Sequence, residues 1–85
     1  MDNLEKYRQC FHKAFSQDVD FDLETAEMGS TPDWDSVGHM ELVTEIEDTF
    51  DIMFETEDIL RFTSYVKGIE ILEKYGVVME GEGHG

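Results

Sequence analysis

Between Ala14 and Leu60 the chain contains no lysine or arginine, although this stretch holds 15 aspartates and glutamates. The flanking segments carry six acids and six bases, so the formal net charge of −15 arises entirely in the middle of the 85-residue chain. Such a charge density pushes a sequence toward disorder, because mutual repulsion opposes compaction. The hydrophobic content of 40% is nevertheless enough for folding. We therefore expect a folded domain whose stability rises with salt.

The charge also restricts the partners. Neutralisation of nucleic-acid phosphates needs a surface of Lys and Arg, and anionic membranes attract the same residues. This chain offers the opposite sign, so both partners are excluded and a protein with a basic surface is the expected counterpart. A chain of 85 residues forms one small domain, whose core is too small to house a deep enzyme pocket.

The cysteine content and the first residues predict the compartment. Cys10 is the only cysteine, which precludes an internal disulfide and suits a reducing environment. The start Met1-Asp2-Asn3 is unlike a signal peptide, and no apolar run approaches the about 18 residues of a membrane span. We therefore expect a cytoplasmic monomer.

Apolar residues at spacings of three and four predict a first amphipathic helix from about Asn3 to Ser16. The apolar stripe consists of Leu4, Tyr7, Phe11, Ala14 and Phe15. Asn3 is the predicted N-cap. Cys10 lies beside the stripe without an obvious base, so we interpret it as a buried or half-buried residue and not as a nucleophile.

The segment from Gln17 to Asp35 has no helical periodicity. Three apolar residues alternate with acids there, as in a half-buried strand: Val19, Phe21 and Leu23. One strand cannot satisfy its own backbone hydrogen bonds, and no second strand of this kind appears. We therefore expect an extended loop whose alternate apolar side chains lie on the helices. A loop of about 19 residues is long for a compact domain unless it has a role.

A second helix is predicted from Ser36 to Phe50. At about 100° per residue, one face of this helix is apolar and the opposite face is acidic. The apolar arc contains His39, Leu42, Val43, Ile46 and Phe50, and the acidic arc contains Glu41, Glu45, Asp48 and Asp51. Val37 falls in the centre of the acidic arc, with Met40 at its edge. Apolar side chains among carboxylates are unusual for a simple solvated face.

A short third helix is predicted to begin at Thr56-Glu57-Asp58 and to end near Arg61. The hydroxyl of Thr56 is the predicted cap, and the two acids that follow suit the first turn.

A last helix is predicted to begin at Thr63 or Ser64 and to stop at Gly76. Its apolar residues are Tyr65, Val66, Ile69, Leu72 and Tyr75. Glu70 and Lys74 have the spacing of an ion pair along the helix. The chain is therefore expected to be all-α, a small bundle of three main helices plus a short third helix. Residues 1–76 form its single domain, and residues 77–85 form a flexible C-terminal tail.

The sequence contains no complete pattern of metal-binding residues. An EF-hand loop needs oxygen ligands at its first, third, fifth and twelfth positions and glycine at its sixth. A loop starting at Asp33 has Val37 at the fifth position and Thr44 at the twelfth, and a loop starting at Asp18 fails at the sixth and twelfth. The residues that suit zinc show no paired ligand spacing; they are Cys10, His12, His39 and His84. We expect no dedicated metal site.

Asp35, Ser36 and His39 lie close together but do not form the pattern of a hydrolytic triad. Asp35 adjoins the serine, His39 falls on the apolar side of the helix, and no G-x-S-x-G turn is present. We interpret His39 as a residue at the edge of the core.

Ser36 admits two interpretations. It follows the turn-forming run Thr31-Pro32-Asp33-Trp34-Asp35 and opens the acidic helix. In the first interpretation, Ser36 or Asp35 merely caps the helix. In the second, Ser36 is a covalent attachment point, where a phosphodiester would meet unpaired backbone N–H groups at the positive end of the helix dipole. Physical chemistry alone leaves both open.

The residues that follow resemble the acyl carrier proteins. That family has Asp-Ser-Leu opening a helix that reads apolar-Glu-Leu-Val and ends in Glu-x-x-Phe, followed by a small or polar residue and Ile. The matching residues here are Asp35-Ser36-Val37-Gly38-His39-Met40-Glu41-Leu42-Val43, then Ile46-Glu47, then Phe50-Asp51-Ile52. The resemblance extends over nearly the whole chain and includes the long loop, which in the family links the first two helices.

The resemblance implies that Ser36, beside Asp35, receives a 4′-phosphopantetheine arm from coenzyme A through a phosphopantetheinyl transferase. The thiol of the arm would carry an acyl or aminoacyl group as a thioester to biosynthetic enzymes, and the protein itself would perform no chemistry. Acids of the second helix would meet basic patches on these enzymes, and Val37 would press into them. The implied partner surface consists of Val37, Met40, Glu41, Glu47 and Asp48.

Two departures from the family pattern bear on the cargo. Val37 replaces the usual leucine. Trp34 and His39, on either side of the serine, look closer to discrete carriers of specialised pathways, such as polyketide, aminoacyl or surface-polysaccharide assembly, than to the housekeeping fatty-acid carrier. The alternative function is an acidic helical adaptor that binds a basic protein without a prosthetic group.

Overall fold

The computed structural model describes residues 2–15, 23–31 and 33–79. The helical elements are α1 (Asn3–Ala14), the 3₁₀ turn η1 (Leu23–Thr25), α2 (Ser36–Phe50), α3 (Thr56–Arg61) and α4 (Tyr65–Lys74). The described residues form an all-α globule without named strands, so the predicted fold class is confirmed. The predictions for Ser16, Val19 and Phe21 lie outside the described residues.

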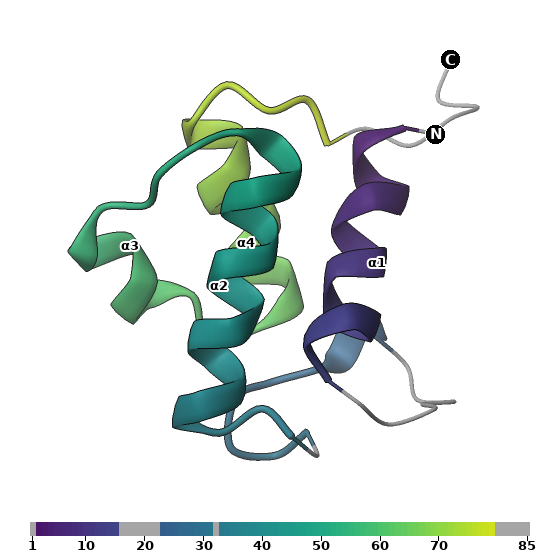
Figure 1. Ribbon diagram of the computed structural model, residues 1–85, viewed down its shortest axis with the longest axis vertical. Helices are drawn as coiled ribbons and strands as arrows, with labels where there is room; N and C mark the ends of the chain where they lie inside the picture. Colours follow the sequence, from purple (N-terminus) through teal and green to yellow (C-terminus); the bar gives the residue numbers. More distant parts are fainter. Residues whose placement is uncertain (1, 16–22, 32, 80–85) are drawn as a thin grey trace.

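The helices are arranged around α2. Figure 1 shows α1 (purple) beside α2 (teal) and running in the opposite direction, with α3 (green) on the other side of α2 and α4 behind it. The contacts between α1 and α2 bring Ala14, at the end of one helix, close to the start of the other. The first turn of α2 therefore lies at one end of the globule, next to the end of α1.

Helix α1 begins at Asn3, as predicted, but ends at Ala14, before the predicted Ser16. Its N-cap is Asp2, whose Oδ1 accepts a hydrogen bond of 2.8 Å from the backbone N–H of Glu5. The prediction of Asn3 as the cap is wrong, because Asn3 is already helical and its side-chain amide donates to the carbonyl of Val78 instead.

Helix α2 has the predicted bounds, Ser36–Phe50, and the predicted amphipathic faces. His39, Leu42, Val43 and Ile46 are buried, and Phe50 is half-buried. Asp51 ends the helix in the left-handed conformation, at φ 56°. The pattern of 3.6 residues per turn was sufficient here because one face of α2 meets the core and the other meets solvent.

Helix α3 also has the predicted bounds, but its predicted cap is wrong. The N-cap position is occupied by Glu55, without a side-chain capping bond, and Thr56 is the first helical residue. The backbone N–H of Glu55 donates to the hydroxyl of Tyr75 at 2.8 Å, so a contact with the end of α4 holds the start of α3.

Helix α4 is capped by Ser64, whose hydroxyl accepts from the N–H of Lys67, and the chain turns at Gly76, with φ 90°, as predicted. The assignment of Val66 to the core is wrong: this side chain is 51% exposed, and Ile71 is buried instead. The other predicted residues of this face do pack on the core: Tyr65 and Leu72 are buried, and Ile69 and Tyr75 are half-buried.

The segment between η1 and α2 is attached to the start of α4. The N–H of Tyr65 donates to the carbonyl of Ala26, and the N–H of Met28 donates to the carbonyl of Thr63. These bonds flank an isolated antiparallel bridge between Glu27 and Ser64. The polar backbone groups of this part of the expected loop are therefore satisfied by hydrogen bonds to Thr63 and Tyr65, at the start of α4.

The core is aromatic at the end nearest the start of α2. The rings in contact there include Tyr7, Phe11, Phe15, Trp34, Phe62 and Tyr65. The buried hydroxyl of Tyr7 donates to the carbonyl of Tyr65 at 2.6 Å. Gly68 is required beside this bond, because a Cβ at that position would overlap the Tyr7 hydroxyl and the Phe62 ring.

The chain after α4 returns to the bundle as far as it is described. Met79 is 4% exposed and belongs to the core, and the carbonyl of Val78 binds Asn3 at the start of α1. Residues 77–79 thus pack on the protein, whereas the rest of the expected tail, residues 80–85, lies outside the described residues. None of the described helices has the length and apolar character needed to cross a membrane.

Candidate functional site at the start of α2

Asp35 is the cap of α2. Its backbone is extended, and its Oδ1 accepts a hydrogen bond of 2.9 Å from the N–H of Gly38. Its carbonyl also accepts from the N–H of His39, which is the first hydrogen bond of the helix. Of the two residues that the sequence offered as caps, Asp35 takes this role and leaves Ser36 without it.

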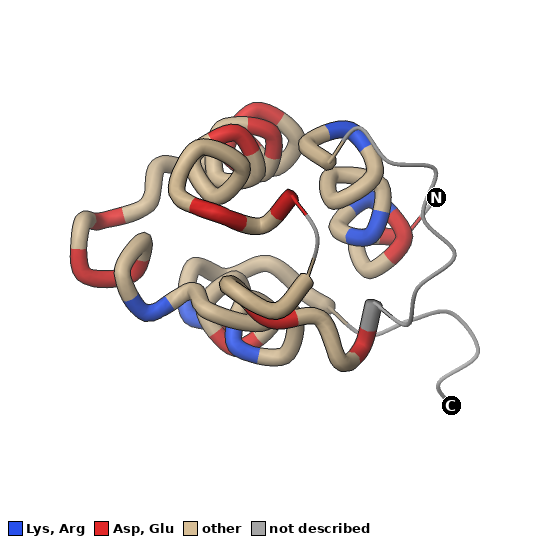
Figure 2. Tube along the Cα trace, turned by 90° about the horizontal axis from the view of Figure 1, so that it is seen from below, with Lys and Arg blue, Asp and Glu red and all other residues tan. Residues whose placement is uncertain are grey.

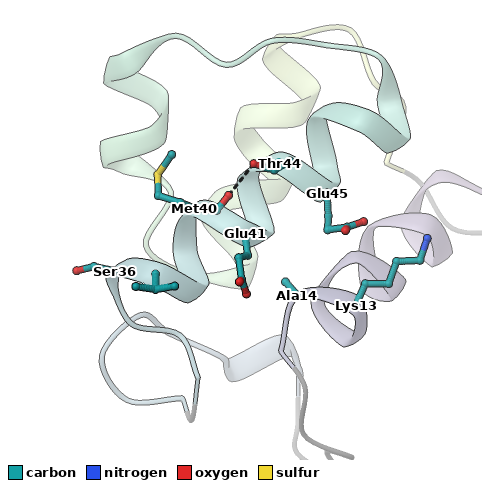
Figure 3. A pocket seen from close by; sticks show the side chains of 8 residues that line it. Lys13, Ala14, Ser36, Met40, Glu41, Thr44 and Glu45 are labelled. Atoms are coloured by element: carbon teal, nitrogen blue, oxygen red, sulfur yellow. Dashed lines mark hydrogen bonds between the residues drawn. The ribbon is translucent and has the colours of Figure 1, made fainter.

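Ser36 is exposed at the surface of the protein. The Ser36 hydroxyl forms no hydrogen bond with any described residue. Figure 3 shows it at the first turn of α2, with its oxygen pointing away from the protein. A nucleophilic oxygen at this place is open to an enzyme that approaches from solvent, and the first backbone N–H groups of the helix lie beside it.

A tight contact fixes the backbone ahead of Ser36. Asp33 has a positive φ of 70°, and its carbonyl lies so close to Gly38 that a Cβ there would overlap it. Trp34 is 1% exposed and packs against Phe15. The buried tryptophan and the glycine together hold the turn against the first turn of α2, which presents Asp35 and Ser36 at the surface.

His39 does not act on Ser36. Its Nδ1 accepts from the indole N–H of Trp34 at 3.0 Å, and its Nε2 lies 2.8 Å from the carbonyl of Ile59. Since the indole can only donate and the carbonyl can only accept, the ring is neutral with its proton on Nε2. Both ring nitrogens are occupied, and the histidine is 6% exposed. The interpretation of His39 as a core-edge residue is confirmed, and a serine–histidine pair is excluded.

The five residues of the predicted partner surface divide into two groups. Val37 and Met40 are 70% and 50% exposed, and Glu41 and Asp48 are also exposed. Glu47 differs, because it is half-buried and its Oε2 accepts from the backbone N–H of Phe54 at 2.9 Å. Glu47 thus holds the segment between α2 and α3.

A groove lies between α1 and α2 and reaches Ser36. Its volume is about 680 Å³, and it is open to solvent. Figure 3 shows Glu41 and Glu45 directed toward the α1 side of this groove, opposite Ala14 and Lys13. We call it the α1–α2 groove; its lining residues are Lys13, Ala14, Ser36, Val37, Met40, Glu41, Thr44 and Glu45.

The bases are confined to certain elements. Figure 2 shows Lys and Arg on α1, on α4 and at the end of α3, where acids are present as well, whereas α2 and the segment before it carry Asp and Glu without bases. Ser36 and Val37 are therefore surrounded by acids on their own element, and Lys13 is the base that lines the α1–α2 groove.

One acid of the same stretch has a different role that the sequence did not reveal. Asp58 is 1% exposed, and its two oxygens accept from the Lys74 ammonium at 2.9 Å and from the Tyr75 hydroxyl at 2.7 Å. The hydrogen bond from Lys74 contributes most to lowering the pKa of Asp58 below its ordinary value, and the hydrogen bond from Tyr75 lowers it further. The predicted pairing of Lys74 with Glu70 is replaced by this contact, which joins α3 to α4.

Cys10 is buried, as predicted. The thiol is 1% exposed and lies 3.4 Å from the hydroxyl of Thr49 on α2. Burial raises the pKa of Cys10, which disfavours the nucleophilic thiolate.

Within residues 2–15, 23–31 and 33–79, no three or more His, Cys, Asp or Glu side chains form a group suited to a metal ion. Comparisons with protein families, with curated proteins and with solved structures find no match to the chain.

Proposed function

We propose that the protein is an acyl carrier that bears a 4′-phosphopantetheine arm on Ser36. The observation that carries the proposal is the division of roles at the start of α2. Asp35 caps the helix through Gly38, while the neighbouring Ser36 is exposed, points outward and lacks a hydrogen bond to the described residues. A serine that only stabilised the helix would use its hydroxyl as the cap.

The chemistry of attachment requires little from this chain. The Ser36 Oγ would attack the pantetheine-side phosphorus of coenzyme A, a phosphodiester would form, and adenosine 3′,5′-bisphosphate would leave with the electrons of the broken P–O bond. The proton of Ser36 must go to a base of the transferase, because both ring nitrogens of His39 are occupied. The backbone N–H groups at the start of α2 favour the new negative charge.

The surface around Ser36 suits an enzyme partner. Val37 and Met40 expose apolar area among the acids Glu41 and Asp48, and this combination fits a partner with an apolar pocket inside a basic patch. The transferase and the enzymes that load and accept the cargo would share this surface. Such partners, and a single buried thiol, are consistent with the cytoplasm. The cargo is an acyl or aminoacyl thioester of a biosynthetic pathway.

The test is the intact mass of the protein after incubation with coenzyme A and a broad-specificity phosphopantetheinyl transferase. We expect a gain of one phosphopantetheine group in the unaltered chain and no gain in Ser36→Ala. Ser30→Ala is the matched control, because Ser30 is another exposed serine near the same end of α2, and it should gain the group normally.

Two results would overturn the proposal: no gain in the unaltered chain, or a gain that survives Ser36→Ala. The first result would favour the alternative function, an acidic adaptor that binds a basic protein through the exposed residues of α2 without a prosthetic group. Circular dichroism of each variant, compared with that of the unaltered chain, separates a lost site from a lost fold.

A further inference from the structure

The α1–α2 groove begins at the residue that would carry the arm. Ser36 lines it, and the next apolar residues along α2, Val37 and Met40, form its first part. A smaller hollow of about 200 Å³ adjoins it, and the two share Ala14, Val37 and Glu41. A continuous depression therefore leads from the start of α2 along its contact with α1.

The order of groups along this depression is apolar first and polar later. Val37 and Met40 follow Ser36 along α2 and line the groove there, and Ala14 lines it from α1. The far end has Glu45 on α2 and Lys13 on α1. Both side chains are close enough to Cys10 to influence the pKa of its thiol in opposite directions. A carboxylate and an ammonium that face one groove offer an acceptor and a donor, which is the combination that one amide group needs.

A phosphopantetheine arm has its groups in the same order. One methylene beyond the phosphate it carries a carbon with two methyl groups, then a carbon with a hydroxyl, and beyond these it has two amides and finally the thiol. Ser36 and Glu45 are nine residues apart on one helix, or about 13 Å along its axis. The extended arm is longer than this distance, so its amides and not its thiol would lie beside Glu45 and Lys13.

We propose that the α1–α2 groove is a resting site for the arm, with Val37 and Met40 against the dimethyl carbon and with Glu45 and Lys13 hydrogen-bonded to an amide. This inference rests on the proposed attachment at Ser36. Covalent attachment gives the arm a high effective concentration at the groove, so weak contacts are sufficient to hold it there. The arm would lie between α1 and α2, and a partner that presses on Val37 would displace it.

The test uses a paramagnetic arm. A conjugate of coenzyme A whose thiol carries a nitroxide is loaded onto Ser36 of the full, ¹⁵N-labelled chain by the transferase, and the backbone amide signals are compared before and after reduction of the nitroxide. We expect the signals of residues 10–14 on α1 and 41–49 on α2 to lose intensity. The signals of α3 and α4 should retain it.

Two variants remove the site in different ways. Thr44→Phe fills the groove from an exposed position, and Lys13→Glu adds a third carboxylate to the groove, after Glu41 and Glu45. Both should restore the signals of residues 10–14. Lys67→Glu is the matched control, because Lys67 is an exposed base on α4 outside the groove, and it should leave the pattern unchanged.

The outcomes separate this inference from the proposed function. Failure to load the conjugate would overturn both. Successful loading would leave the proposed function in place, while weak broadening over the whole chain would show an arm in solvent and overturn the groove site. Broadening confined to α3 and to residues 52–55 would place the arm on the other side of α2 and would also overturn it.

Discussion

Asp58 and Glu41 both belong to the stretch of the chain that lacks Lys and Arg, yet their surroundings are opposite. Asp58 is buried at the junction of α3 and α4, where Lys74 and Tyr75 bind both of its oxygens. Glu41 is exposed on α2, beside Val37 and the start of the helix. The first acid holds two helices together, while the second contributes charge to a surface. A count of acids cannot separate these two uses, because the difference lies in what each carboxylate contacts.

The largest difference in stability should appear between the removal of a buried carboxylate, that of Asp58, and the removal of an exposed one on α2, that of Asp48. We expect Asp58→Asn to lower the free energy of unfolding by about 2 kcal/mol, because the buried amide keeps only one acceptor oxygen where the carboxylate accepts two hydrogen bonds. Lys74 is partly exposed, so the loss should come mainly from the hydrogen bonds and less from the ion pair. Urea denaturation measures the change. Asp48→Asn, on the exposed face of α2, is the control and should stay within about 0.5 kcal/mol; equal losses would remove the distinction.

The contribution of Asp58 to stability should depend on pH. Hydrogen bonds from Lys74 and Tyr75 lower the pKa of Asp58 in the folded protein. A lowered pKa contributes stability that is fully present above the unfolded value of about 3.9 and is lost as the pH falls through the folded value. The difference in unfolding free energy between the unaltered chain and Asp58→Asn should therefore be constant above about pH 5 and shrink below about pH 4. A difference that stays constant down to pH 2 would contradict this assignment.

At the start of α2, replacing Asp35 should cost more stability than replacing its neighbour Ser36. The difference should be smaller than that between Asp58 and Asp48. Asp35→Ala removes the capping bond to Gly38 and should cost about 1 kcal/mol. Ser36→Ala removes no hydrogen bond and should change stability by less than about 0.5 kcal/mol. Thermal denaturation of the unmodified proteins measures both. A larger loss in Ser36→Ala would mean that the serine is structural.

Reversing the charge of Glu41 should have the smallest effect on stability but should weaken the reaction with a partner enzyme. Glu41→Lys should leave the fold intact and lower the kcat/KM of the transferase several-fold, with a larger effect at low salt. Glu73→Lys reverses the charge of an exposed acid on α4 and serves as the control. Equal rate losses in the two variants would point to net charge alone and not to a docking surface on α2.

The sequence predicted the regular parts of the fold because their signals are local. Helices α2 and α3 have the predicted bounds, and the buried face of α2 follows from apolar spacing. The errors concern contacts between residues far apart in the chain. Val66 has the spacing of a core residue, but it is exposed where α4 packs on the bundle, and Ile71 is buried.

The parts of the candidate site that depend on neighbouring residues were predicted, and the parts that depend on distant residues were not. The motif around Ser36 is continuous in sequence, and the exposure of Val37 follows from its helical position. The role of Glu47 was not foreseen, because its partner, the N–H of Phe54, lies beyond the end of α2. The role of Asp58 was missed as well, since its partners Lys74 and Tyr75 lie on another helix.

By itself, the sequence determined the helices, the acidic middle of the chain and the serine that opens α2, because periodicity, charge and turn residues act over a few neighbouring positions. The tertiary structure decided that Asp35 is the cap and leaves Ser36 exposed, that both nitrogens of His39 are occupied, and that a groove separates α1 from α2. These features depend on distances between segments that only the folded chain brings together. The chain has 21 acids of similar chemistry, and only their contacts in the fold distinguish Asp58, which is buried and hydrogen-bonded, from Glu41, which faces solvent.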